Sequence, residues 1–90
     1  MPVIENTVVI TNKVGLHARP AALLVQEAGR FQARIQVRHG EMTANAKSIV
    51  GVLKLGANMG AILTIHADGE DACEAVKALL ELFERKFDEE

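Results

Sequence analysis

The order and spacing of the apolar residues predict an α+β domain, a two-layer open-faced β-sandwich with three helices on one face of a four-stranded antiparallel sheet. Strand-like and helix-like runs alternate along the chain as β-α-β-β-α-β-α, which favours this class. Residues 33–38 alternate apolar and polar side chains, which indicates a strand with one face in water and hence an antiparallel sheet. Because the chain has 90 residues, of which 49% are hydrophobic and 24% charged, we expect one domain over residues 1–90.

A strand, a turn and a helix are predicted first. Ile4–Thr11 has the period of a strand, with Asn6, Val8 and Ile10 on one face. Asn12–Gly15 is expected to turn the chain. A helix should follow from Ala18 to Ala28 or Gly29, because apolar residues then recur at helical spacing. Its expected buried stripe consists of Ala21, Leu24, Val25, Ala28 and Phe31.

The middle of the chain predicts a hairpin and a short helix. The second strand should cover Ala33–Arg38, and residues 39–41 contain the glycine of a tight turn. A return strand is expected over Met42–Asn45, followed by a helix over Ala46–Leu55. The side chains expected to face the core from these elements are Ala33, Ile35, Val37, Val52 and Leu55.

The last part predicts a strand and a long helix. After a loop over residues 56–60, Ala61–Ala67 should form the last strand. The carboxylates among residues 70–74 favour the start of a helix there, and this helix should end near Arg85. We expect Phe87 to anchor the end of this helix and residues 88–90 to be frayed. The expected inward residues are Leu63, Ile65, Ala67, Ala72, Val76, Leu79, Leu80 and Phe83.

Composition excludes several classes of function. A net charge of −2 gives no electrostatic basis for binding nucleic acid or an anionic membrane, and no apolar run approaches the ~20 residues of a membrane span. The single cysteine, Cys73, cannot form an internal disulfide and is expected to be a small packing residue. We therefore expect a cytoplasmic protein.

Metal and cofactor sites are not expected either. His17, His39 and His66 lie far apart in sequence, and none has ligand spacing to Cys73. Phosphate-binding loops and serine nucleophile motifs are not found. A domain of this size leaves little room for a substrate pocket, which favours a protein that is acted upon over an enzyme.

The segment Gly15-Leu16-His17-Ala18-Arg19-Pro20 is the strongest candidate site. It joins the first strand to the first helix, where free backbone N–H groups bind anions. His17 would bring a nucleophilic ring nitrogen to this place, and Arg19 and the N–H groups from Ala18 onward would hold a phosphate. Both the helix dipole and Arg19 disfavour the imidazolium, so we expect a neutral His17. Taken singly, His17 would be a cap or surface residue and Arg19 a solvated charge.

The chain resembles the HPr family of phosphocarrier proteins, which serve the bacterial phosphoenolpyruvate-dependent sugar phosphotransferase system. The matching residues are Gly15 to Ala21, Lys47 to Leu53, and Leu55-Gly56. The resemblance implies a strand order of 1-4-2-3 and phosphorylation of His17 at Nδ1 by enzyme I. It further implies delivery of the phosphoryl group to enzyme II A subunits, with no cofactor. We expect a monomer.

Ser48 has two interpretations. It sits where a helix N-cap or first-turn serine is common for structural reasons. The resemblance offers phosphorylation by an ATP-dependent serine kinase, the HPr kinase/phosphorylase, with a catabolite-control regulator as a further partner. The segment Lys47 to Gly51 fits that pattern, although other members carry the serine unmodified.

Ile49, Val50 and Leu53 form a second apolar cluster on the short helix. A surface helix buries only one stripe, so either loops cover this cluster or it is an exposed docking patch. The resemblance favours docking, because HPr proteins bind partners with this helix.

Two rival functions remain open from the sequence. One is an HPr-like carrier of the nitrogen-related phosphotransferase branch, favoured by the C-terminal Phe87-Asp88-Glu89-Glu90 and by residues 16–19; Pro20, Lys47 and Gly51 favour the sugar branch. The other is a regulatory interaction module without phosphotransfer, against which the presence of His17 argues.

Overall fold

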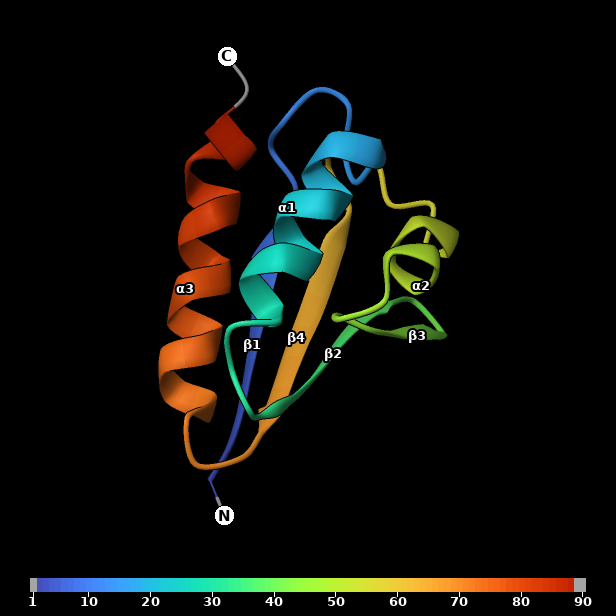
Figure 1. Cartoon of the computed structure of the whole chain (residues 1–90). Helices are drawn as coiled ribbons and strands as arrows, with labels where there is room; N and C mark the ends of the chain where they lie inside the picture. Colours follow the sequence, from blue (N-terminus) through green and yellow to red (C-terminus); the bar gives the residue numbers. More distant parts are fainter. Residues whose placement is uncertain (1, 89–90) are drawn as a thin grey trace.

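A four-stranded antiparallel sheet in the order β1-β4-β2-β3 forms one layer of the computed structural model, which describes residues 2–88 (Figure 1). Its strands are β1 (Val3–Val9), β2 (Arg34–His39), β3 (Met42–Asn45) and β4 (Ile62–Asp68). The helices α1 (Ala18–Ala28), α2 (Ile49–Lys54) and α3 (Ala72–Glu84) lie on one side of this sheet and form the second layer. The predicted fold class and the strand order 1-4-2-3 are confirmed.

The core lies between the sheet and the helices, where alternate residues of the central strands face the helical layer. In the pairing of β2 with β4, Ile35 lies opposite Ala67 and Val37 opposite Ile65. All four side chains are fully buried. The helices cover them with Leu24, Val52 and Leu79, which are also fully buried. Burial of one such aliphatic side chain stabilises a fold by ~1.5–3 kcal/mol, so this interface is the main source of stability.

The first strand ends earlier than the predicted Thr11. Its regular register stops where Val9 pairs with Ile62. Beyond that point Ile10 faces two residues: its N–H donates to the Ala61 carbonyl at 2.9 Å, and its carbonyl accepts from the Gly60 N–H at 2.8 Å. An extra residue on one strand interrupts a ladder in this way. The strands β2 and β4 each begin and end one residue later than predicted.

The second helix is shorter than the predicted Ala46–Leu55. A turn precedes it, in which the Lys47 N–H donates to Asn45 Oδ1 at 2.9 Å and the Ser48 N–H to the Asn45 carbonyl at 2.9 Å. Ser48 is therefore the N-cap, and its Oγ accepts from the Gly51 N–H at 3.1 Å. The capping serine fixes the start of the helix.

The burial of α3 corrects the predictions for two of its residues. Cys73 is exposed rather than a packing residue, because it lies one turn before Lys77 on the solvent-facing flank. Leu80 is only half-buried, whereas Ala75 and Leu82 are buried. Two other members of the predicted core are likewise half-buried, Val25 and Phe31.

Phe87 anchors the C-terminal end of α3, as predicted. It is fully buried, and its ring meets Phe83 edge-to-face with centroids 4.9 Å apart. Asp88, predicted to be frayed, lies in the 3₁₀ turn η1 (Lys86–Asp88) and accepts from Arg85 Nε at 3.1 Å. The rest of the predicted frayed tail, residues 89–90, lies outside the described residues.

Asp71, the residue before α3, ties this helix to the connection between α1 and β2. Its two carboxylate oxygens accept from the Gln32 N–H at 2.8 Å and the Ala33 N–H at 2.9 Å. The Gln32 hydrogen bond is the main cause that lowers the pKa of Asp71, and Ala33 and the charge of Lys47 add to it.

This arrangement predicts acid-sensitive stability. A lowered pKa means that the ionised Asp71 stabilises the fold above the ordinary aspartate pKa of about 3.9, and that this contribution disappears as the pH falls through the lower folded value. Urea unfolding should therefore show Asp71→Asn less stable than the parent by a constant amount near neutral pH, with the gap closing in acid. Asp68→Asn, an exposed aspartate at the end of β4, is the control. A gap that persists unchanged into acid would contradict this role.

Candidate functional site

The loop before α1 is held in place by the opposite loop at residues 56–58. The Leu16 N–H donates to the Ala57 carbonyl at 2.9 Å. Gly15 has a φ of +63° and packs so closely that a Cβ there would lie 2.5 Å from the Ala57 oxygen and 2.7 Å from Asn58 Cα. The buried side chain of Asn12 donates through Nδ2 to the Gly15 carbonyl at 2.9 Å. These contacts fix the backbone immediately before His17.

His17 is the N-cap residue of α1, with an extended backbone (φ −77°, ψ −169°). Its carbonyl accepts the first intrahelical hydrogen bond, from the Ala21 N–H at 2.8 Å. The N–H groups of Ala18 and Arg19 therefore have no acceptor within the helix, and Pro20 has no N–H to satisfy. The exposed His17 side chain forms no capping hydrogen bond to the described helix. Its ring is thus exposed beside two N–H groups that have no acceptor within the helix.

A hollow of about 250 Å³ opens beside His17. His17 and Ala18 line one side, and Leu53 of α2 and Asn58 line the other. The structure thereby brings two predicted features together, the histidine segment and the second apolar cluster, although about 36 residues of sequence separate them. Arg19 is exposed at the second position of α1, so its guanidinium can reach an anion held at the helix start.

Ile49, Val50 and Leu53 are all solvent-exposed, by 38%, 59% and 41%. No loop within residues 2–88 covers them. Val52 on the same helix is fully buried and Leu55 nearly so, as predicted. Of the two alternatives for this cluster, burial beneath loops is therefore wrong for the described residues.

His39 and His66 have hydrogen-bond partners outside the His17 segment. His39 Nδ1 is 3.1 Å from the Leu55 carbonyl, to which it must donate because a carbonyl only accepts. His66 Nδ1 is 3.1 Å from a Glu5 carboxylate oxygen on the open face of the sheet. Across the described residues, no group of three potential metal ligands comes together. None of the helices in the described part of the chain is long and apolar enough to cross a membrane.

Three contacts near the site were not predicted from the sequence. The sequence predicts a turn at Asn12 but not the hydrogen bond of its side chain to the Gly15 carbonyl. It does not predict the contact of Gly15 with Ala57 and Asn58 either, because that contact arises from packing in the folded chain. Lys47 was known only as part of a motif. Its ammonium donates to the Phe31 carbonyl at 2.6 Å and so ties the start of α2 to the connection after α1.

Comparison with known proteins gives a consistent result. The family model described as "PTS HPr component phosphorylation site" matches residues 4–85. The phosphocarrier protein HPr of Xylella fastidiosa (strain 9a5c) is 44% identical over 87 residues, which cover 97% of this chain and 98% of the relative.

Solved structures agree. HPr-C-His from Thermoanaerobacter tengcongensis has 49% identity and a TM-score of 0.94, with 97% of this chain and 98% of that chain covered. A structure described as an HPr dimer from the same organism has 49% identity and a TM-score of 0.78, covering 91% of this chain and 94% of that one. From a full-length match in sequence and in fold, the chain belongs to the HPr family, the phosphocarrier proteins of the phosphoenolpyruvate-dependent phosphotransferase system.

Proposed function

We propose that His17 accepts a phosphoryl group from enzyme I, charged from phosphoenolpyruvate, and passes it to sugar-specific enzyme II A subunits. The observation that carries this proposal is the position of His17, exposed at the N-cap of α1 beside the free N–H groups of Ala18 and Arg19. Membership of the HPr family supports it. The acceptor is a carrier and not an enzyme, because the group leaves again for the next protein.

The transfer uses one ring nitrogen, which we assign to Nδ1. Its lone pair attacks the phosphorus of the donor, so that an N–P bond forms while the bond from phosphorus to the donor atom breaks. The donor atom keeps that electron pair, and the His17 ring releases its remaining N–H proton to water. The phosphoryl oxygens accept hydrogen bonds from the Ala18 and Arg19 N–H groups and from the Arg19 guanidinium. Delivery to the next protein reverses these roles.

One copy of the chain supplies the groups that these steps use, because His17, Ala18 and Arg19 are consecutive residues at the start of α1. The monomer is therefore the working unit that we propose. A cytoplasmic location follows from the proposed partners, since enzyme I and enzyme II A subunits exchange the group with it directly.

Incubation with enzyme I and phosphoenolpyruvate tests the function. Intact mass should rise by a single phosphoryl group that acid removes, as expected of a phosphoramidate, and peptide mapping should place it on His17. His39 and His66 in the same sample serve as internal controls. Label that survives acid or maps elsewhere would contradict the proposal.

We assign docking of these partners to the exposed cluster Ile49, Val50 and Leu53. Leu53 lines the hollow of His17, so a partner seated there reaches both features. Leu53→Asp should raise the apparent KM of enzyme I about tenfold or more, because it places a hydrated charge in an apolar contact. Ile62→Asp, at an exposed apolar residue on the far sheet face, should leave KM unchanged. Equal KM values for the two variants, from phosphorylation kinetics, would remove the cluster from docking.

Ser48 is proposed as a regulatory site for a serine kinase, because the cap hydroxyl borders the docking cluster. Ser48→Asp keeps an N-capping acceptor at this position, so stability should stay near the parent, whereas Ser48→Ala should lose about 1 kcal/mol. The added charge should weaken phosphorylation by enzyme I, because it lies next to Ile49 and Val50. Ser48→Asn, which caps without charge, is the control. Thermal unfolding and transfer kinetics of all three variants distinguish a regulatory role of Ser48 from a purely structural one. Normal transfer by Ser48→Asp would show that Ser48 acts only as a helix cap.

A further inference from the structure

Asn58 lines the same hollow as His17 but belongs to a different loop. Among the described residues that line this hollow, only His17 and Asn58 have polar side chains. The Asn58 side chain is exposed, and within residues 2–88 it forms no hydrogen bond. A carboxamide offers two N–H donors and one oxygen acceptor. These donors are therefore available to a group that enters the hollow.

Hydrogen bonds on both sides of Asn58 hold its backbone in place. One residue earlier, the Ala57 carbonyl accepts from the Leu16 N–H at 2.9 Å. Two residues later, the Gly60 N–H donates to the Ile10 carbonyl at 2.8 Å. The loop is thus tied both to the segment before α1 and to the end of β1. A donor on such a loop is already positioned before the reaction begins.

The backbone of Asn58 also lies close to the His17 segment. A Cβ added to Gly15 would lie 2.7 Å from the Asn58 Cα. His17 follows Gly15 by two residues, a separation that a chain spans in at most ~7 Å. Because the side chains of Asn58 and of a phosphorylated His17 each extend several ångströms further, they can meet across a hollow of about 250 Å³.

A phosphoryl group on His17 presents three terminal oxygens, and the donors described above all belong to the first turn of α1. They are the N–H groups of Ala18 and Arg19 and the Arg19 guanidinium. An oxygen directed into the hollow points away from that turn. An anionic oxygen without a hydrogen-bond donor is costly beside apolar side chains such as Leu53. In the described lining, the Asn58 amide is the side chain that supplies such a donor.

We propose that Asn58 is a further catalytic residue of the phosphoryl transfer, which donates a hydrogen bond from Nδ2 to the phosphoryl oxygen directed into the hollow. This inference rests on the proposed phosphorylation of His17. Asn58 forms no covalent bond and moves no proton. It stabilises negative charge on oxygen while the N–P bond forms and breaks. Because the amide is neutral, it adds a donor without a second full positive charge beside Arg19, so the group remains able to leave.

Two substitutions of Asn58 separate this role from support of the loop. Asn58→Ala should lower the kcat of phosphorylation by enzyme I about tenfold with little change in KM, because it removes a donor to a charged group. Asn58→Asp should be slower still, because it keeps the size of asparagine but brings a carboxylate to the phosphoryl oxygens. Support of the loop predicts the opposite order, since aspartate preserves the packing and alanine does not.

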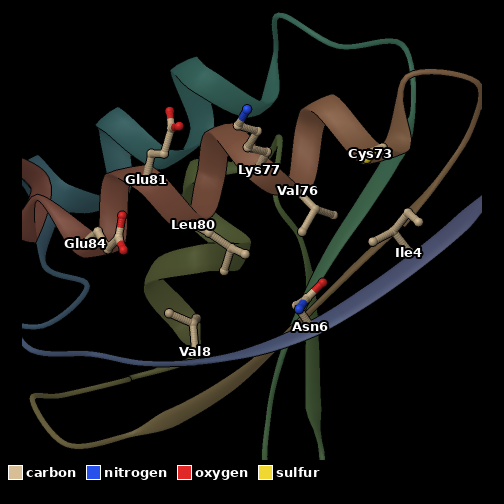
Figure 2. A pocket seen from close by; sticks show the side chains of 9 residues that line it. All are labelled: Ile4, Asn6, Val8, Cys73, Val76, Lys77, Leu80, Glu81 and Glu84. Atoms are coloured by element: carbon tan, nitrogen blue, oxygen red, sulfur yellow. The ribbon is translucent and has the colours of Figure 1, made fainter.

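Asn6→Asp is the matched control for the change in charge. Figure 2 shows Asn6 of β1 in the groove between this strand and α3, which shares no lining residue with the hollow of His17. Both asparagines are exposed. Asn6→Asp should therefore transfer at the parent rate, and urea unfolding shows that each variant is folded. A kcat of Asn58→Asp that equals or exceeds that of Asn58→Ala would overturn the proposal.

NMR spectroscopy of the phosphorylated protein tests the contact itself. When a ¹⁵N-labelled sample is phosphorylated by enzyme I, a side-chain amide proton of Asn58 should shift downfield, because a hydrogen bond to an anionic oxygen is a strong one. The amide protons of Asn6 should stay unchanged. An Asn58 side-chain signal that does not move on phosphorylation of His17 would overturn the proposal.

Phosphoramidate, which phosphorylates histidine rings without a partner protein, separates this inference from the proposed function. The same Asn58 shift is expected when His17 is phosphorylated in this way. If enzyme I leaves the parent unlabelled but phosphoramidate produces the shift, the assignment of enzyme I is wrong and the Asn58 contact stands. If enzyme I labels His17 and the Asn58 signal does not move, the contact is wrong and the proposed function stands.

Discussion

His17→Ala should abolish phosphoryl acceptance from enzyme I and leave the fold intact. The ring nitrogen is the atom that forms the N–P bond, and alanine offers no replacement. Loss of a nucleophile removes at least about 10³ of the transfer rate. Stability should change by less than about 0.5 kcal/mol, because the side chain is exposed and caps no described helix N–H. Quench-flow phosphorylation and urea unfolding measure the two quantities.

Graded variants separate the nucleophile from its surroundings. Arg19→Ala should slow the same step by about 10–100-fold without stopping it, because the Ala18 and Arg19 N–H groups still hold the phosphate. His39→Ala and His66→Ala should transfer at the parent rate, since their partners are Leu55 and Glu5 and not the α1 start. Label on His17→Ala from enzyme I would move the acceptor to another residue.

The elements with a regular period were predictable from the sequence. The residues of α1 follow helical spacing, and the helix was found over Ala18–Ala28 as expected. The strand order was not derivable from spacing, because β1 pairs with β4 across more than fifty residues; it came from the family resemblance. A local pattern carries information on which face of an element is apolar, but not on which element it meets.

The misplaced boundaries show where local signals compete. Residues 46–47 fit a helical stripe, but α2 begins only at Ile49. Asn45 accepts hydrogen bonds from the N–H groups of Lys47 and Ser48, and these bonds form a turn in place of the first helical turn. Cys73 is small and apolar, but it lies on the exposed face of α3. The buried face of this helix is formed by other apolar residues, among them Ala72, Ala75, Val76 and Leu79.

The histidine segment was predictable because its chemistry is local. A strand-to-helix junction, a histidine at the N-cap and free amides beside it all lie within five residues of sequence. The supporting loop at Ala57 and Asn58 was not predictable from the sequence. The hydrogen bond from the Leu16 N–H to the Ala57 carbonyl joins residues far apart in sequence and exists only in the folded chain.

That supporting contact predicts a large effect for Gly15→Ala. The φ of +63° costs an alanine about 1–2 kcal/mol. In addition, the new Cβ would lie 2.5 Å from the Ala57 oxygen and 2.7 Å from Asn58 Cα, both of them backbone atoms that move only with their loop. We expect a total loss of about 3 kcal/mol or more in the free energy of unfolding.

Gly40→Ala is the matched control, because it isolates the clash from the backbone strain. Gly40 has a φ of +62° in the turn between β2 and β3, and apart from its two chain neighbours no residue comes within 4 Å of its added Cβ. It should lose only the strain of about 1–2 kcal/mol and transfer phosphoryl groups at the parent rate. Gly15→Ala should also slow transfer to His17, because separating residues 15–16 from the Ala57 loop displaces the N-cap. Urea unfolding and quench-flow kinetics on both variants give the comparison: if Gly15→Ala is no less stable than Gly40→Ala, the 57–58 loop does not hold the histidine segment in place.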